Sequence, residues 1–153
     1  MNFQAISLVL GAIGTVLGLA NTYVQLNTHR LRLRITPMSA QRGDGGMLTH
    51  RDKLLPSPTM AIEVVNLSAF PVTISSVGLK LRDGRRLAWL DPIVVDGKPW
   101  PRRLDARESV TVCQPIQKLP SNVTKAYATT ACGEERFGTS PAFKEILRLA
   151  PRG

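Results

Sequence analysis

"IEVVNLSAFPVTISSVGLKLRDGRRL", residues 62–87, decides the fold that we expect for this chain. Apolar and polar residues alternate in both halves of the stretch, which is the period of half-buried β-strands. A short corner, "LSAFP", separates the two halves, and Asp83-Gly84 is a strong hairpin signal because both residues accept a positive φ at low cost. The stretch therefore predicts a strand, a corner, a second strand and a hairpin.

The longer of these strands contains an irregularity. Its apolar parity changes between Ile74 and Val77, so one extra residue is needed to keep both side chains on the inner face. We therefore expect a β-bulge near Ser75 and Ser76.

The same two-residue period continues outward on both sides of this stretch. Leu31, Leu33 and Ile35 alternate with arginines, and residues 38–58 between them and the central stretch predict a long loop rich in Gly and Pro. A strand is also expected over residues 60–66, before the corner. Beyond the hairpin we expect short strands within residues 86–90, 102–104, 109–113 and 123–132. Turns are expected at Asp96-Gly97, at 105–107 and at Gly133, which leads into "ERFG", residues 135–138.

A short helix is predicted near the C-terminus. Ser140 can cap it, Pro141 suits its first position, and Phe143, Ile146 and Leu147 form an apolar stripe. Several short strands without βαβ alternation, followed by one terminal helix, predict a mainly β protein: an antiparallel immunoglobulin-like β-sandwich over residues 29–153. The Cys-Trp-Cys pattern of antibody domains is absent, so the term describes architecture alone.

Residues 1–28 follow different rules, because they contain no charged side chain. Phe3 to Tyr23 is dominated by apolar residues and has the length, roughly 20 residues, that a membrane-crossing helix needs. We therefore predict an N-terminal transmembrane anchor over residues 1–28. A cleaved signal peptide is an alternative, although "MNFQ" lacks the positive charge typical of one. A helix buried in a soluble protein or in a larger assembly has the same sequence pattern.

The charges beside this segment predict its orientation. Arg30, Arg32 and Arg34 follow it directly, and Lys and Arg are retained on the cytoplasmic side of a membrane. We expect a single-pass protein of the inner membrane whose C-terminal domain is cytosolic, with a virion as the alternative location.

Three glycines lie close to one stripe of the predicted helix. Gly11, Gly14 and Gly18 include a small-xxx-small pair that allows close helix packing in lipid. Self-association through this stripe is one interpretation; the other is that glycine is simply common in membrane helices.

The net charge of +9 belongs entirely to residues 29–153. Such a charge favours anionic partners. Two groups of arginines form the candidate surface for them, although a solvated face that confers solubility is the simpler interpretation; they are Arg82, Arg85 and Arg86, and Arg102, Arg103 and Arg107.

Catalytic residues are not apparent. His29 and His50 lack metal-ligand spacing. Cys113 and Cys132 have no identifiable activating base, so we interpret the two cysteines as a core residue and a turn residue. We predict no catalytic, cofactor-binding or metal site, no small-molecule substrate and no enzymatic activity.

The uncharged N-terminal segment, the stretch from residue 62 to 87, "RRLDARESVTV" and "KAYATTACGEERFGTSPAFK" together resemble a widespread, largely uncharacterised group of small bacterial and phage proteins. The resemblance spans most of the chain and implies a single-pass anchor followed by a small sandwich. It implies no catalytic residues.

These observations predict a non-enzymatic, membrane-anchored interaction module that presents a basic sandwich at the membrane surface and joins an oligomer or a larger complex. A phage virion or assembly component, whose apolar helix packs in a protein or membrane layer, is the alternative. A nucleic-acid-binding accessory protein is a further one, less favoured because exposed aromatic residues beside the arginines are few.

Overall fold

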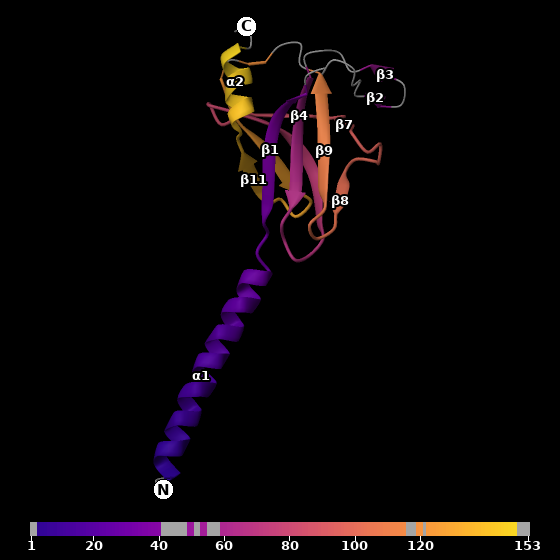
Figure 1. The fold of residues 1–153 in the computed structure, drawn as a ribbon. Coiled ribbons are helices and arrows are strands. Elements are labelled where there is room, and N and C mark those ends of the chain that lie inside the picture. The colour runs from indigo at the N-terminus through magenta and orange to yellow at the C-terminus, as the bar shows by residue number, and fades with distance from the viewer. Residues whose placement is uncertain are drawn as a thin grey trace. The chain divides into compact units, whose positions relative to one another are not determined.

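The fold is described from a computed structural model, which describes residues 3–40, 49–50, 53–54, 59–115, 119–120 and 122–149. The chain divides into two compact units, residues 1–31 and residues 32–153. The first unit is a single helix and the second is a β domain (Figure 1).

Helix α1 spans Phe3–Thr28 and confirms the helix expected near the N-terminus. Its sequence contains no proline to interrupt it, and Thr15 and Thr22 bond back to the carbonyl oxygens of Gly11 and Gly18, four residues earlier. All side chains described in this helix, those of residues 10–26, are exposed in the unit taken by itself. Within the part of the chain that the structure describes, no helix has both the length and the apolar character needed to cross a membrane.

One sheet of the β domain contains four strands in the order β1-β4-β9-β7, with all pairs antiparallel. Its strands are β1 (Leu33–Ala40), β4 (Thr59–Asn66), β9 (Ser109–Pro115) and β7 (Ile93–Val94). The central strand β4 is buried along almost its whole length and has a paired strand on each side.

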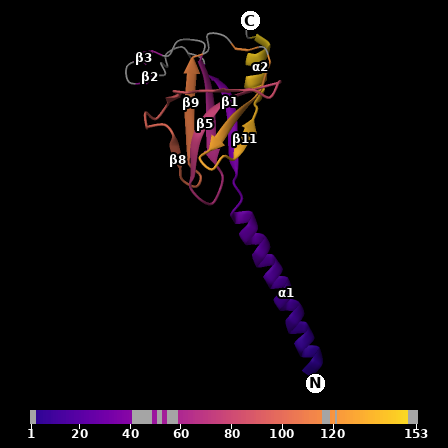
Figure 2. The ribbon, with the colours of Figure 1, turned by 180° about the vertical axis from the view of Figure 1, so that it is seen from behind.

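The second sheet has the order β11-β10-β5-β6, and β8 pairs with the other end of β5. Its strands are β11 (Glu135–Gly138), β10 (Val123–Thr130), β5 (Val72–Leu81), β6 (Arg86–Ala88) and β8 (Arg102–Leu104). Figure 2 shows β5 and β11 from the side opposite to Figure 1. The mainly β, antiparallel fold that the sequence predicts is thus confirmed.

Alternate residues of both sheets form one apolar core. Fully buried side chains come from both sheets and include Ile62, Val64, Ile74, Val77, Leu104 and Val112. The expected first strand also follows this pattern: Ile35 is buried, whereas Arg32 and Arg34 are exposed, although the strand begins at Leu33 and not at Arg30.

The bulge predicted in the central stretch is confirmed at Ser75. In the pairing of β5 with β10, Ser76 lies opposite Thr129 and Ile74 lies opposite Thr130, so Ser75 is the extra residue. Its hydroxyl donates to the carbonyl oxygen of Thr129 at 3.0 Å. The bulge returns both Ile74 and Val77 to the core, as their common burial requires.

The predicted turns are confirmed as well. Gly84, Gly97 and Gly133 all have positive φ, between 68° and 87°, and Gly84 closes the hairpin between β5 and β6. Arg107 also has a positive φ, of 69°, in the turn that precedes β9.

The two layers are joined at one side by β11 and helix α2 (Pro141–Leu149), which both contact β1. A Cβ atom on Gly138 would lie 1.9 Å from the carbonyl oxygen of Ile35, so this crossing requires glycine. Ser140 caps α2 as predicted: its hydroxyl accepts from the amide of Phe143 at 3.0 Å and donates to the carbonyl oxygen of Pro37. Phe143 is fully buried beneath this helix.

The long loop expected over residues 38–58 lies mostly outside the described residues. Within it, β1 continues to Ala40, and β2 (Thr49–His50) pairs with β3 (Lys53–Leu54). His50 therefore belongs to a short strand.

Candidate anion-binding surface

The structure corrects the prediction for Arg102, one of the arginines expected to form a surface for anionic partners. Arg102 is only 7% exposed. It lies on β8 directly opposite Ile74 of β5, and residues opposite each other in a ladder project to the same face of a sheet. Because Ile74 projects into the core, Arg102 does so too.

The buried guanidinium is neutralised inside the protein. Its Nη2 atom lies 2.7 Å from Oε1 of Glu108 and 3.2 Å from Oδ2 of Asp96. The second oxygen of Glu108 accepts a hydrogen bond from the backbone amide of Asp105 at 2.8 Å. This bond has the largest effect in lowering the pKa of Glu108, and the hydrogen bond from Arg102 has the next largest. Arg102 lies on one sheet and Glu108 precedes a strand of the other, so the ion pair links the layers.

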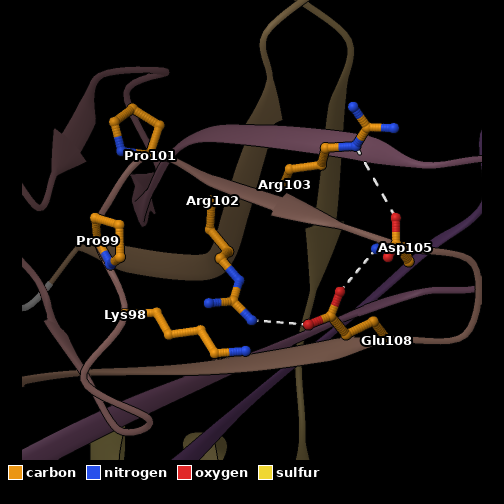
Figure 3. Close-up of a pocket in the computed structure, with 7 residues that line it drawn as sticks. All are labelled: Lys98, Pro99, Pro101, Arg102, Arg103, Asp105 and Glu108. Atoms are coloured by element: carbon orange, nitrogen blue, oxygen red, sulfur yellow. Dashed lines mark hydrogen bonds and ion pairs between the residues drawn. The ribbon is translucent and has the colours of Figure 1, made fainter.

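A pocket of 580 Å³ opens beside this ion pair. In Figure 3, Lys98 lies beneath the Arg102 guanidinium, Glu108 lies to its right, and the rings of Pro99 and Pro101 lie to its left. Its lining is Lys98, Pro99, Pro101, Arg102, Arg103, Asp105 and Glu108. Two carboxylates offset three cations here, and Asp96 contributes a further negative charge to Arg102. The pocket therefore has little preference for an anion.

The other arginines near this pocket are exposed. Arg103 projects away from the core, and its Nε atom is 3.9 Å from a carboxylate oxygen of Asp105. Arg107 donates its backbone amide to the carbonyl oxygen of Asn66 at 2.9 Å, which fixes the turn and leaves its side chain at the surface.

The second predicted group of arginines lies around the hairpin between β5 and β6. All three are exposed. Arg85 forms an ion pair with Asp83 at 2.8 Å, and Arg86 forms one with Glu135 of β11. The structure shows no carboxylate within ion-pair distance of Arg82 among the described residues.

The sheet register brings two lysines beside this group that sequence analysis did not single out. Lys80 of β5 lies directly opposite Arg86 of β6 on one side and opposite Lys125 of β10 on the other. Their neighbours Leu79 and Ala126 are buried, so the three cations lie on the outer face of the sheet. We call Lys125, Lys80 and Arg86 the cationic row. The charge of each residue is visible in the sequence, but the register that joins them is not.

Aromatic side chains accompany the cationic row. The Nζ atom of Lys80 lies 4.4 Å from the centre of the Phe137 ring, which is a cation–π contact. Tyr127 is almost fully buried, and burial raises the pKa of its hydroxyl. The charges of Arg86 and Glu135 act on this pKa in opposite directions, Arg86 lowering it and Glu135 raising it.

The predicted residues of α1 and of the arginine cluster that follows it are exposed. In α1, a Cβ atom on Gly11, Gly14 or Gly18 would meet no atom within 4 Å, so the predicted packing stripe is open. The three flanking arginines, Arg30, Arg32 and Arg34, are exposed, and the backbone amide of Arg32 donates to the hydroxyl of Ser68 at 2.9 Å.

The two thiols differ as the sequence predicts. Cys113 is a buried residue of β9, and burial raises its pKa. Cys132 is exposed in the turn before β11, where the Thr130 hydroxyl lies 3.0 Å from its sulfur and lowers its pKa. Among the residues described, no group of three or more potential metal ligands comes together.

Comparisons with known proteins add little to this geometry. No family model matches the chain. No curated protein matches it either. One solved structure, described as the "X-ray structure of Northeast Structural Genomics Consortium target SoR45", is similar with a TM-score of 0.29 and 8% identity, over 72% of this chain and 87% of that one.

Proposed function

We propose that this protein is a non-enzymatic, membrane-anchored interaction module. In this proposal α1 is embedded in lipid, and the β domain, an immunoglobulin-like β-sandwich, is held at the cytoplasmic leaflet for protein partners. The observation that carries the proposal is the set of exposed apolar side chains along α1. In the unit taken by itself, eight large ones between Leu10 and Leu26 are 51% to 71% exposed.

Such a surface is unfavourable in water. Covering one large aliphatic side chain is worth roughly 1.5 to 3 kcal/mol, so eight of them favour an apolar environment strongly. At 100° per residue these positions occupy more than half of the helix circumference, which suits a surrounding medium better than one flat partner surface. The proposal requires that lipid cover these side chains.

The flanking charges support the cytoplasmic side. Arg30, Arg32 and Arg34 are exposed directly after α1. Within a Debye length of an anionic leaflet, each basic residue contributes about 1 kcal/mol to attraction. The inner membrane, with the domain in the cytosol, is therefore the location that we propose.

Fractionation of the full-length chain tests this proposal. The chain is synthesised with phospholipid vesicles, floated on a density gradient and washed with high salt and alkaline carbonate. We expect it to float and to resist both washes. The double substitution Ile13→Lys and Leu17→Lys should release it, whereas Ala142→Lys, at an exposed position of α2, should not. A wild-type chain that stays at the bottom as a monomer would refute the anchor.

A second candidate function is supported by the open glycine stripe of α1. Glycines at small-xxx-small spacing allow the backbones of two helices to approach closely, and a Cβ atom added at Gly11, Gly14 or Gly18 would meet nothing within 4 Å beyond the adjoining helix backbone. In this candidate, α1 packs against other helices in an assembly such as a virion. A wild-type chain that sediments without lipid as a defined oligomer would favour it.

A further inference from the structure

The three cations of the row lie side by side across adjacent strands. We propose that this row, Lys125, Lys80 and Arg86 on the outer face of the β11-β10-β5-β6 sheet, is a docking surface for the phosphate groups of an anionic lipid leaflet. The inference rests on the proposed function, because α1 brings the domain to a membrane, and it names the second contact that the domain makes there.

The register of this sheet places like charges opposite each other. Lys80 lies directly opposite Lys125 and directly opposite Arg86, so both of its cross-strand neighbours are cations. Like charges that face each other across a ladder destabilise a sheet. A partner with negative charges placed over the row would remove this repulsion.

The side chains of the row are incompletely neutralised. Arg86 reaches Glu135, and Lys80 turns its ammonium toward the Phe137 ring. Lys125 is exposed, and no carboxylate of the described residues lies within ion-pair distance of it. The row, the adjoining hairpin and the Glu135 partner of Arg86 together hold five cations and two carboxylates, an excess of three positive charges. The cations are Lys80, Arg82, Arg85, Arg86 and Lys125, and the carboxylates are Asp83 and Glu135.

The chemistry of the surface favours lipid headgroups over a nucleic acid. Proteins that bind single strands place several aromatic rings beside their cations for the bases to stack on. Phe137 is the exposed ring here among the residues described, and Lys80 already lies over it. A row of cations on a sheet face, without further rings, can meet the phosphates of a membrane surface.

Amine acylation of the full-length chain tests the inference. The protein is incorporated into vesicles of phosphatidylcholine alone or of phosphatidylcholine with 30% phosphatidylglycerol, and the acylation rate of each lysine is measured by mass spectrometry. We expect Lys80 and Lys125 to react at least threefold more slowly on the anionic vesicles at low salt, and equally on both vesicles in 1 M salt. Lys98 and Lys144, exposed elsewhere on the same domain, are internal controls.

Three results would overturn the inference. Equal rates on the two vesicles, or the same slowing at Lys98 and Lys144, would show that the row does not meet lipid. Protection on neutral vesicles by inorganic phosphate or by a single-stranded oligonucleotide, without protection by phosphatidylglycerol, would assign the row to a soluble anion. Failure of the chain to float with either vesicle is a different result, because it refutes the proposed anchor.

Charge reversal provides an independent measurement. Lys125→Glu should reduce the protection of Lys80 on anionic vesicles to less than twofold, while Lys144→Glu should leave it unchanged. Circular dichroism confirms that each variant is folded. Full protection of Lys80 in a folded Lys125→Glu variant would contradict the proposed row.

Discussion

Oε1 of Glu108 lies 2.7 Å from Nη2 of Arg102, and this ion pair connects the two sheets of the domain. Arg102 belongs to β8, which pairs with β5, whereas Glu108 directly precedes β9. The same carboxylate holds the amide of Asp105, so one side chain fixes both the edge of the domain and the turn beside it.

Replacing Glu108 should make the free energy of unfolding less dependent on pH in the acid range. The pKa of Glu108 is lowered from 4.5 by the Asp105 amide and by Arg102. A lowered carboxyl pKa contributes stability that is present above the unfolded value and lost as pH falls through the folded value. Glu108→Gln should therefore lower the free energy of unfolding at pH 7 by about 1 kcal/mol, since the carboxylate is partly exposed.

Urea unfolding of both chains at pH 7 and at pH 3 checks this prediction. The difference between Glu108→Gln and the wild type should shrink from pH 7 to pH 3, because stability from a carboxyl with a lowered pKa is lost as the pH falls through that pKa. Glu145→Gln, at an exposed position of α2, is the matched control and should differ little at either pH. A difference that is the same at both pH values would contradict the role given to the ionised carboxyl.

The outcome at Arg102 shows where sequence analysis reaches its limit. The bulge at Ser75, the glycine turns and the Ser140 cap depend on neighbouring residues, so local patterns predict them. The burial of Arg102 depends on its pairing with Ile74, and the cationic row depends on the pairing of Lys80 with Lys125, 45 positions later. Registers between distant strands cannot be obtained from such patterns.

A buried asparagine fixes the corner of the central stretch. Nδ2 of Asn66 donates to the carbonyl oxygens of Phe70, Leu104 and Asp105 at 2.8 to 3.2 Å, and its Oδ1 accepts from the amide of Ser68. Asn66→Ala leaves these buried groups without a partner and should cost about 3 kcal/mol in the free energy of unfolding.

Thermal and urea unfolding of the variants measure this cost. Asn122→Ala is the control, because Asn122 is half-buried and its amide makes one long contact with Asp83, of 3.4 Å. We expect a change of about 0.5 kcal/mol there. Equal effects of the two substitutions would show that the corner does not depend on the Asn66 side chain.

The two thiols should react at very different rates. The pKa of Cys132 is lowered and its sulfur is exposed, whereas burial raises the pKa of Cys113. Since the thiolate is the reactive form, an aromatic disulfide reagent at pH 7.5 should modify Cys132 rapidly and Cys113 after unfolding. Cys132→Ser should abolish the fast phase. A fast phase that persists in this variant would contradict the assignment.

Collision accessibility of a nitroxide on α1 tests the central claim most directly. Ile13→Cys in a Cys132→Ser background is spin-labelled and incorporated into vesicles, and its relaxation is measured with oxygen and with a water-soluble nickel chelate. A label embedded in lipid meets oxygen and excludes nickel, which is the result that we predict. A label that meets nickel freely lies in water, and one that excludes both reagents is packed in protein; either result would contradict a lipid-embedded anchor.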